Sequence, residues 1–198
     1  MENNESLNFL SGIIEEWGGE KYAEDPVGTY ADQYPTNSIL IDVFPYTIKD
    51  PDKYHQVSIF YRKWIDRDIT SRTYRSFEKR YLDFLKTVWL YNRVDMSYCL
   101  SFDNYFRKGS SKKWLFNHRV PIERTQRNVT DWCSIKEVIS LALREAGFLW
   151  LYFQDWKMLA VINDFSIQLL VKEQETFNLV SPLLVSNHLY SRLSSDTV

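Results

Sequence analysis

The sequence has little cysteine, glycine or proline, and it lacks long apolar runs. Among its 198 residues are 2 Cys, 6 Gly and 6 Pro. Cys99 and Cys133 are too few for a disulfide framework and too far apart for a zinc knuckle, so we expect two reduced, structural thiols. Low glycine and proline content predicts a chain that lies mostly in regular elements with short connections.

The longest apolar run extends from Phe148 to Phe153, six residues, whereas a membrane-spanning helix needs roughly 20. The first residues, Met1 to Ser6, are polar and acidic and do not resemble a targeting leader. We therefore expect a cytoplasmic, soluble protein that does not bind a membrane.

Motifs of the common enzyme classes are also missing. The sequence contains neither a Gly-x-Gly-x-x-Gly loop nor a Gly-Lys-Ser/Thr loop, which wrap phosphates with backbone N–H groups. It has no Gly-x-Ser-x-Gly elbow, and His55, His118 and His188 stand singly. We expect no cofactor and favour a protein that is not an enzyme.

One metal site stays open as an alternative. Asp66 and Asp68 could hold Mg²⁺ together with Asp42 or Asp103, as acidic residues do in nuclease sites. The same two residues also suit a solvated loop before a helix, where acids are favoured near the positive end of the dipole. We favour the interpretation as a solvated loop. Convergence of the four acids in the structure would instead favour a metal site.

What the chain does contain is ordinary for a globular protein: 44% hydrophobic, 25% charged and 16% aromatic residues. These values predict one domain over residues 1–198 with an ample core. Apolar periodicity predicts helices and strands at the following positions. The helices are 7–17, 71–90, 134–146 and one from 181; the strands are 38–44, 56–61, 95–102, 148–153, 158–162 and 165–171; the tail from about 194 is frayed.

This order, α-β-β-α-β-loop-α-β-β-β-α, predicts an α+β fold with a mostly antiparallel sheet and helices packed on it. We expect 38–44 and 56–61 to form a hairpin and the last three strands a meander around a central strand at 148–153. Ser134 and Glu137 resemble a capping box for the third helix, which Gly147 would end. Ser181-Pro182 would begin the last helix.

Charge is distributed unevenly along the chain. Residues 1–70 carry a net charge of −7, residues 71–130 carry +8 and residues 131–198 carry −3. Much of the positive charge lies in a long loop, about 103–129, where bases alternate with aromatics. We take these residues as candidates for partner binding: Lys108, Lys112, Lys113, Trp114, Arg119, Arg124 and Arg127.

Such a segment suits an acidic protein surface or nucleic acid, and it also suits a solvated connection. Our leading hypothesis is a non-catalytic protein-interaction module, of the bacterial or phage immunity or inhibitor type that binds and neutralises another protein. The alternative is a nucleic-acid-binding or metal-dependent nucleic-acid-processing protein that uses the basic loop.

Overall fold

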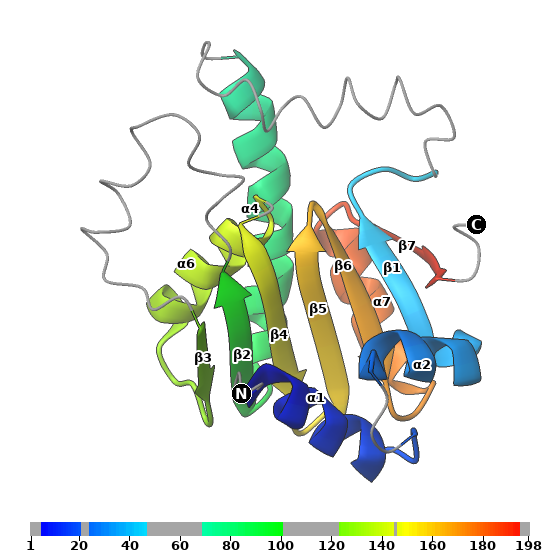
Figure 1. The fold of residues 1–198 in the computed structure, drawn as a ribbon. Helices are drawn as coiled ribbons and strands as arrows, with labels where there is room; N and C mark the ends of the chain where they lie inside the picture. Colours follow the sequence, from blue (N-terminus) through cyan, green and yellow to red (C-terminus); the bar gives the residue numbers. More distant parts are fainter. Residues whose placement is uncertain (1–4, 21–23, 47–68, 101–122, 145, 195–198) are drawn as a thin grey trace.

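The computed structural model describes residues 5–20, 24–46, 69–100, 123–144 and 146–194 (Figure 1). Its elements follow in chain order. They are α1 (Glu5–Glu16), α2 (Pro26–Gln33), the 3₁₀ turn η1 (Pro35–Asn37), β1 (Ser38–Asp42), α4 (Ile69–Leu90), β2 (Val94–Leu100), β3 (Glu123–Gln126), α6 (Trp132–Ala142), β4 (Gly147–Phe153), β5 (Met158–Asp164), β6 (Ser166–Val171), α7 (Thr176–Ser186) and β7 (Tyr190–Leu193).

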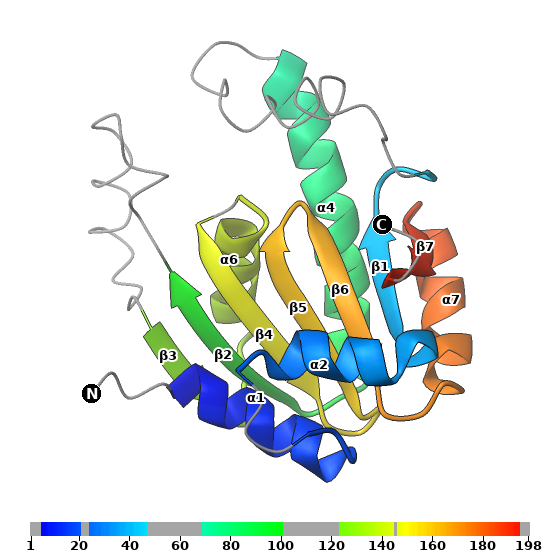
Figure 2. The same cartoon turned by 45° about the vertical axis from the view of Figure 1, so that its right-hand side comes forward.

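A seven-stranded antiparallel sheet forms the middle layer, in the order β3-β2-β4-β5-β6-β1-β7. Helices α1 and α2 lie on its front face, and α4, α6 and α7 lie on its back face (Figures 1 and 2). The predicted α+β class and antiparallel sheet are confirmed. The meander is confirmed too, because β4 pairs with β5 and β5 with β6.

The larger core lies between the back face of the sheet and α4, α6 and α7. The predicted stripe of α4 faces it: Tyr81, Phe84, Leu85 and Val88 are buried, and Phe77 is partly buried. Positions three and four residues apart share one face of a helix, so this spacing places the stripe against the sheet.

A second core lies on the front face, beneath α1 and α2. Ile14 and Trp17 pack there against Tyr152 of β4, and the Tyr30 hydroxyl of α2 donates to the Val171 carbonyl at 2.9 Å. Both faces of β4 are therefore covered by helices. This explains why residues 148–153 are apolar at consecutive positions, and it confirms that the strand lies inside the sheet.

Three predicted helix boundaries are wrong. Asp131 caps α6, because its carboxylate accepts the N–H groups of Cys133 and Ser134, each at 3.1 Å. The predicted cap, Ser134, lies inside the helix. That helix ends at Ala142, and Gly147 begins β4 instead.

Helix α7 begins at Thr176, five residues before the predicted start, so Pro182 lies inside it. Proline cannot donate to the carbonyl four residues earlier, that of Asn178. Asn178 is exposed, and water can satisfy the carbonyl there. This places the proline where the helix tolerates it.

The predicted hairpin is wrong for β1. From Ile39 to Ile41 this strand pairs with β6 on one side and β7 on the other, so both of its edges are occupied. Residues 56–61 themselves lie outside the described residues. Four short elements escaped prediction: α2 and η1 before β1, β3 within the expected loop, and β7 after the last helix.

Candidate protein-interaction surface

Most of the predicted partner-binding residues lie outside the described residues: Lys108, Lys112, Lys113, Trp114 and Arg119. Arg124 is exposed on β3. Arg127 follows β3, and its Nη1 donates to Asp95 Oδ2 at 2.7 Å while its guanidinium lies over the Phe9 ring at 5.3 Å. Arg127 thus has a structural contact of its own, although its side chain is 63% exposed.

The acids proposed for a metal are not brought together among the described residues. Asp66, Asp68 and Asp103 lie outside them. Asp42 accepts a hydrogen bond from Arg192 Nη2 at 2.9 Å and another from the Phe44 N–H at 3.1 Å. In the described part of the chain, no group of three or more His, Cys, Asp or Glu is arranged to hold a metal ion.

The cysteines and histidines show no catalytic arrangement among the residues that the structure describes. Cys133 is exposed in the first turn of α6, and Cys99 is half-buried on β2. His188 is exposed at the end of α7, while His55 and His118 lie outside the described residues. Among the described helices, none is long and apolar enough to span a membrane.

Exposed apolar side chains gather near the end of the chain. Nine large apolar or aromatic side chains are exposed among the described residues, and four of these lie between Leu179 and Leu193. Exposed fractions are 53% for Leu179, 73% for Val185, 44% for Tyr190 and 37% for Leu193. Exposed apolar side chains that lie together mark interaction sites more often than scattered single residues do.

Helix α7 is the origin of this surface, because it is apolar on two faces. Val180 and Leu184 are buried in the core, and Leu183 packs partly against it. Leu179, Pro182 and Val185 follow at a spacing of three and point to solvent. On the outer face they lie among the exposed polar residues Asn178, Ser181 and Ser186, and this face has no cover within the described residues.

The turn after α7 brings β7 beside the helix. Leu189 N donates to Leu184 O at 2.9 Å and His188 N to Val185 O at 3.1 Å. His188 adopts a left-handed φ of 53°, as the residue at this place in a Schellman cap does. Leu189 and Leu184 are both buried, which is the apolar contact that accompanies this motif.

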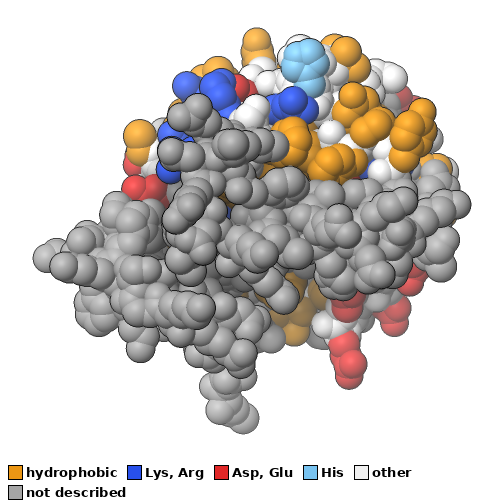
Figure 3. Space-filling view, turned by 90° about the horizontal axis from the view of Figure 1, so that it is seen from above, with side chains coloured by type: hydrophobic (Ala, Val, Ile, Leu, Met, Phe, Trp, Pro, Cys, Tyr) orange, Lys and Arg blue, Asp and Glu red, His pale blue; other side chains and the backbone are white. Residues whose placement is uncertain are grey.

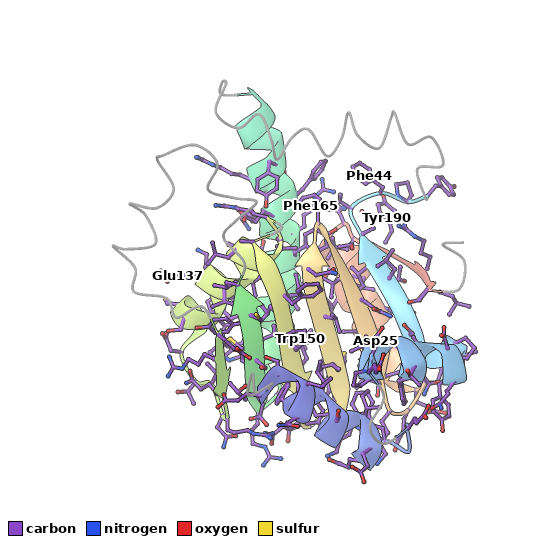
Figure 4. The ribbon with its side chains drawn as sticks, in the orientation of Figure 1. Asp25, Phe44, Glu137, Trp150, Phe165 and Tyr190 are labelled. Carbon is purple, nitrogen blue, oxygen red and sulfur yellow. The ribbon has the colours of Figure 1, made fainter. Side chains whose placement is uncertain are left out.

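Strand β7 is an edge strand. It pairs with β1, from Ile39↔Leu193 to Asp42↔Tyr190, and no other described strand pairs with it. Its outer row of N–H and C=O groups can accept a further strand. Tyr190 lies at the end of the sheet where β1 continues to Phe44 (Figure 4).

Residues of α7 and β7 carry almost no charge of their own, although Arg80 of α4 lies beside them and its Nη1 donates to the His188 carbonyl at 3.2 Å. Residues 176–193 contain one formally charged side chain, Arg192, in a chain that is 25% charged. Arg192 is paired with Asp42, and both side chains are less than 20% exposed, at 17% and 16%. Figure 3 shows hydrophobic side chains near the pale-blue histidine, with a Lys or Arg side chain directly beside it.

We name this feature the α7–β7 surface and define it by Leu179, Pro182 and Val185 of α7 and Leu193 of β7, which lies on the same sheet face as its partner Ile39. Tyr190 pairs with Asp42 and lies on the opposite face of the sheet. Neither Arg124 nor Arg127, the two predicted partner-binding residues that the structure describes, belongs to it, although the sequence holds a signal for it. Eighteen residues with a single charge are unusual in this chain, and the spacing of the apolar residues is too dense for a helix that buries one face.

Phe148 is another exposed aromatic, away from α7 and β7, on β4. It is 48% exposed and stacks on Trp150 of the same strand, with ring centroids 5.8 Å apart. Trp150 lies on the front face of the sheet (Figure 4). Its own stacking partner explains the position of Phe148 without a ligand.

No protein-family model, curated protein or solved structure matches the chain. The geometry of the described residues is therefore the basis on which a function can be proposed.

Proposed function

We propose that this protein is a non-catalytic protein-interaction module and that it binds through the α7–β7 surface. The observation that carries the proposal is the outer face of α7. Leu179 and Val185 are more than half exposed on a helix whose inner face already fills the core. Water contact with this apolar area is unfavourable, and a bound protein would remove it.

The neighbouring strand supports the same proposal. An edge strand offers main-chain hydrogen bonds to an added strand, while the apolar side chains beside it supply buried area. The α7–β7 surface combines both contributions within residues 179–193. Aromatic and aliphatic side chains with few charges are typical of the centre of an interface.

We further propose, from charge, that the partner is another protein which this chain neutralises, as bacterial or phage immunity proteins do. Residues 71–130 carry a net charge of +8, which suits an acidic partner and would speed association. The basic candidates between Lys108 and Arg127 would then form a second contact. Nucleic acid remains the alternative partner for that segment.

Affinity capture from the native host tests the proposal. We expect the wild type to retain one stoichiometric protein after nuclease treatment, and the L179Q/V185Q variant to lose it. Leu90→Gln is the matched control, because Leu90 is 65% exposed at the end of α4 and glutamine suits a helix. Capture of the same partner by the double variant would refute the role of this surface.

Charge reversal tests the basic segment separately. We expect the triple change of Lys108, Lys112 and Lys113 to Glu to slow association with a protein partner, with little effect on thermal stability. Binding that survives only without nuclease, and falls log-linearly with salt, would instead favour nucleic acid.

A further inference from the structure

We infer that the partner of the α7–β7 surface presents an acidic side chain to Arg80 of α4, beside the apolar contact that it makes with α7. The inference rests on the proposed function, since it names the chemistry of the partner at the same surface. A charged contact next to an apolar one would distinguish this partner from other proteins with apolar surfaces.

Arg80 lies beside the end of α7 that carries Val185. Its Nη1 donates to the His188 carbonyl at 3.2 Å, and the His188 N–H donates in turn to the Val185 carbonyl at 3.1 Å. Val185 is 73% exposed. Helices α4 and α7 also lie on the same face of the sheet (Figures 1 and 2). A protein that covers Val185 therefore comes close to the guanidinium of Arg80.

Arg80 has no acidic partner within the described residues. Three arginines in that part of the chain are half-buried: Arg80, Arg144 and Arg192. Arg144 pairs with Glu78 and Arg192 with Asp42, each at 2.9 Å. No described carboxylate lies within ion-pair distance of Arg80. Its charge is therefore not neutralised by the described part of the fold.

Neutral groups hold the guanidinium of Arg80 in place. Its central carbon lies over the Phe77 ring, 5.0 Å from the centroid, and the His188 carbonyl accepts a hydrogen bond from Nη1. A guanidinium has several N–H donors in one plane, so others remain for a carboxylate, which arginine binds through parallel hydrogen bonds. Because the side chain is already held, little rotamer freedom is lost when an acid binds.

Desolvation of Arg80 makes an acidic partner favourable. A partner that covers Val185 also removes water from the neighbouring guanidinium, and a charge that loses water without gaining a counter-charge is unfavourable. A carboxylate at that place offsets this loss and adds charge-assisted hydrogen bonds. Arg80 also belongs to residues 71–130, whose net charge of +8 would attract an acidic protein during its approach.

Selection of peptides tests the inference with a defined probe. A phage-displayed library of random peptides is selected on the immobilised full chain, and the binders are screened against the L179Q/V185Q variant. We expect the peptides that this variant no longer binds to combine apolar residues with Asp or Glu. Selection on Arg80→Gln should give no enrichment in Asp or Glu. Arg75→Gln, which removes the same charge from an exposed position of α4, should retain the enrichment.

A double-mutant cycle with one such synthetic peptide assigns the acid to Arg80. Arg80→Gln should raise the Kd of the peptide about tenfold or more, as the loss of a charged hydrogen bond does. Replacing the acid of the peptide by its amide should have the same effect, and wild type and Arg80→Gln should bind the amide peptide alike. Arg80→Lys keeps the charge without the planar fork, so its affinity for the acidic peptide should lie between the two. Equal losses for both peptides would show a structural role of Arg80 and overturn the inference.

The failures of the two proposals are distinguishable. Peptides that L179Q/V185Q loses, but that show no enrichment in Asp or Glu or bind Arg80→Gln as tightly as wild type, overturn the acidic contact and leave the proposed function standing. A selection that yields no peptide sensitive to L179Q/V185Q overturns both.

Discussion

The ion pair between Glu78 of α4 and Arg144, just after α6, tests how the back layer is held together. Arg144 Nε and Nη2 donate to the two carboxylate oxygens of Glu78 at 3.0 and 2.9 Å. The Tyr74 hydroxyl donates to Glu78 Oε1 at 3.4 Å. The Glu78 side chain is 8% exposed and that of Arg144 is 31% exposed. Arg144→Met would keep much of the apolar stem and leave a nearly buried carboxylate without its cation.

Removing one partner of a fully buried ion pair costs about 3–5 kcal/mol. Nearly a third of the Arg144 side chain is in water, so water can reach the carboxylate once the guanidinium is gone. We therefore expect Arg144→Met to lower the free energy of unfolding by about 2–3 kcal/mol. Adding Glu78→Gln removes the stranded charge but keeps an oxygen for Tyr74. The double variant should regain about 1 kcal/mol or more.

Urea unfolding at pH 7, followed by tryptophan fluorescence, measures these differences. Lys79→Met is the control, because the Lys79–Asp83 pair is exposed, at 72% and 46%. We expect it to change the free energy of unfolding by less than about 0.5 kcal/mol. An Arg144→Met variant no less stable than this control, or a double variant less stable than Arg144→Met, would refute the reasoning.

Four other predictions concern the core, the helix caps and the sheet. Phe84→Ala should lower the free energy of unfolding by about 3–5 kcal/mol, and Phe77→Ala by about half as much, because Phe84 is fully buried and Phe77 only partly; equal losses in denaturant unfolding would contradict the burial. His188→Gly should raise the melting temperature, because glycine adopts the left-handed φ of 53° without strain; a lower melting temperature would mean that the cap is not the one described. Asp131→Ala should destabilise the protein at pH 7. Hydrogen bonds from the Ser134 hydroxyl and from the Cys133 and Ser134 N–H groups lower the pKa of Asp131 in the folded state. Its contribution is therefore present above the ordinary aspartate value of 3.8 and is lost as pH falls below it, so a gap between wild type and variant that persists at pH 2 would refute the cap. Amides of β4 should be among the slowest to exchange, since strands flank it on both sides, and fast exchange there would place it at an edge.

The strongest periodic patterns of the sequence determined the interior of this fold. The apolar stripe of α4 and the apolar run of β4 each predict which faces are buried, because apolar residue types favour burial. The meander was also predictable from local sequence, because strands joined by short polar turns usually pair with each other. These local signals were sufficient for the α+β class.

Local patterns did not determine the edges of the sheet. Strands β3 and β7 have four residues each, which is too few to show a clear alternation of apolar and polar residues. They are strands because they pair with the neighbouring strands β2 and β1. The sequence also suggested a local hairpin for β1, whereas the structure inserts it between β6 and β7. Pairing over more than a hundred residues of sequence depends on matching surfaces that no short window contains.

The candidate surface divides in the same way. The sequence supplied its parts: a charge-poor stretch, apolar residues at dense spacing, and Arg192. Only the tertiary structure decided that one face of α7 fills the core and the other meets water. It also paired Arg192 with Asp42, 150 residues away. Apolar residues in a sequence show what could be buried, and the packing of the other elements decides which of them remain exposed.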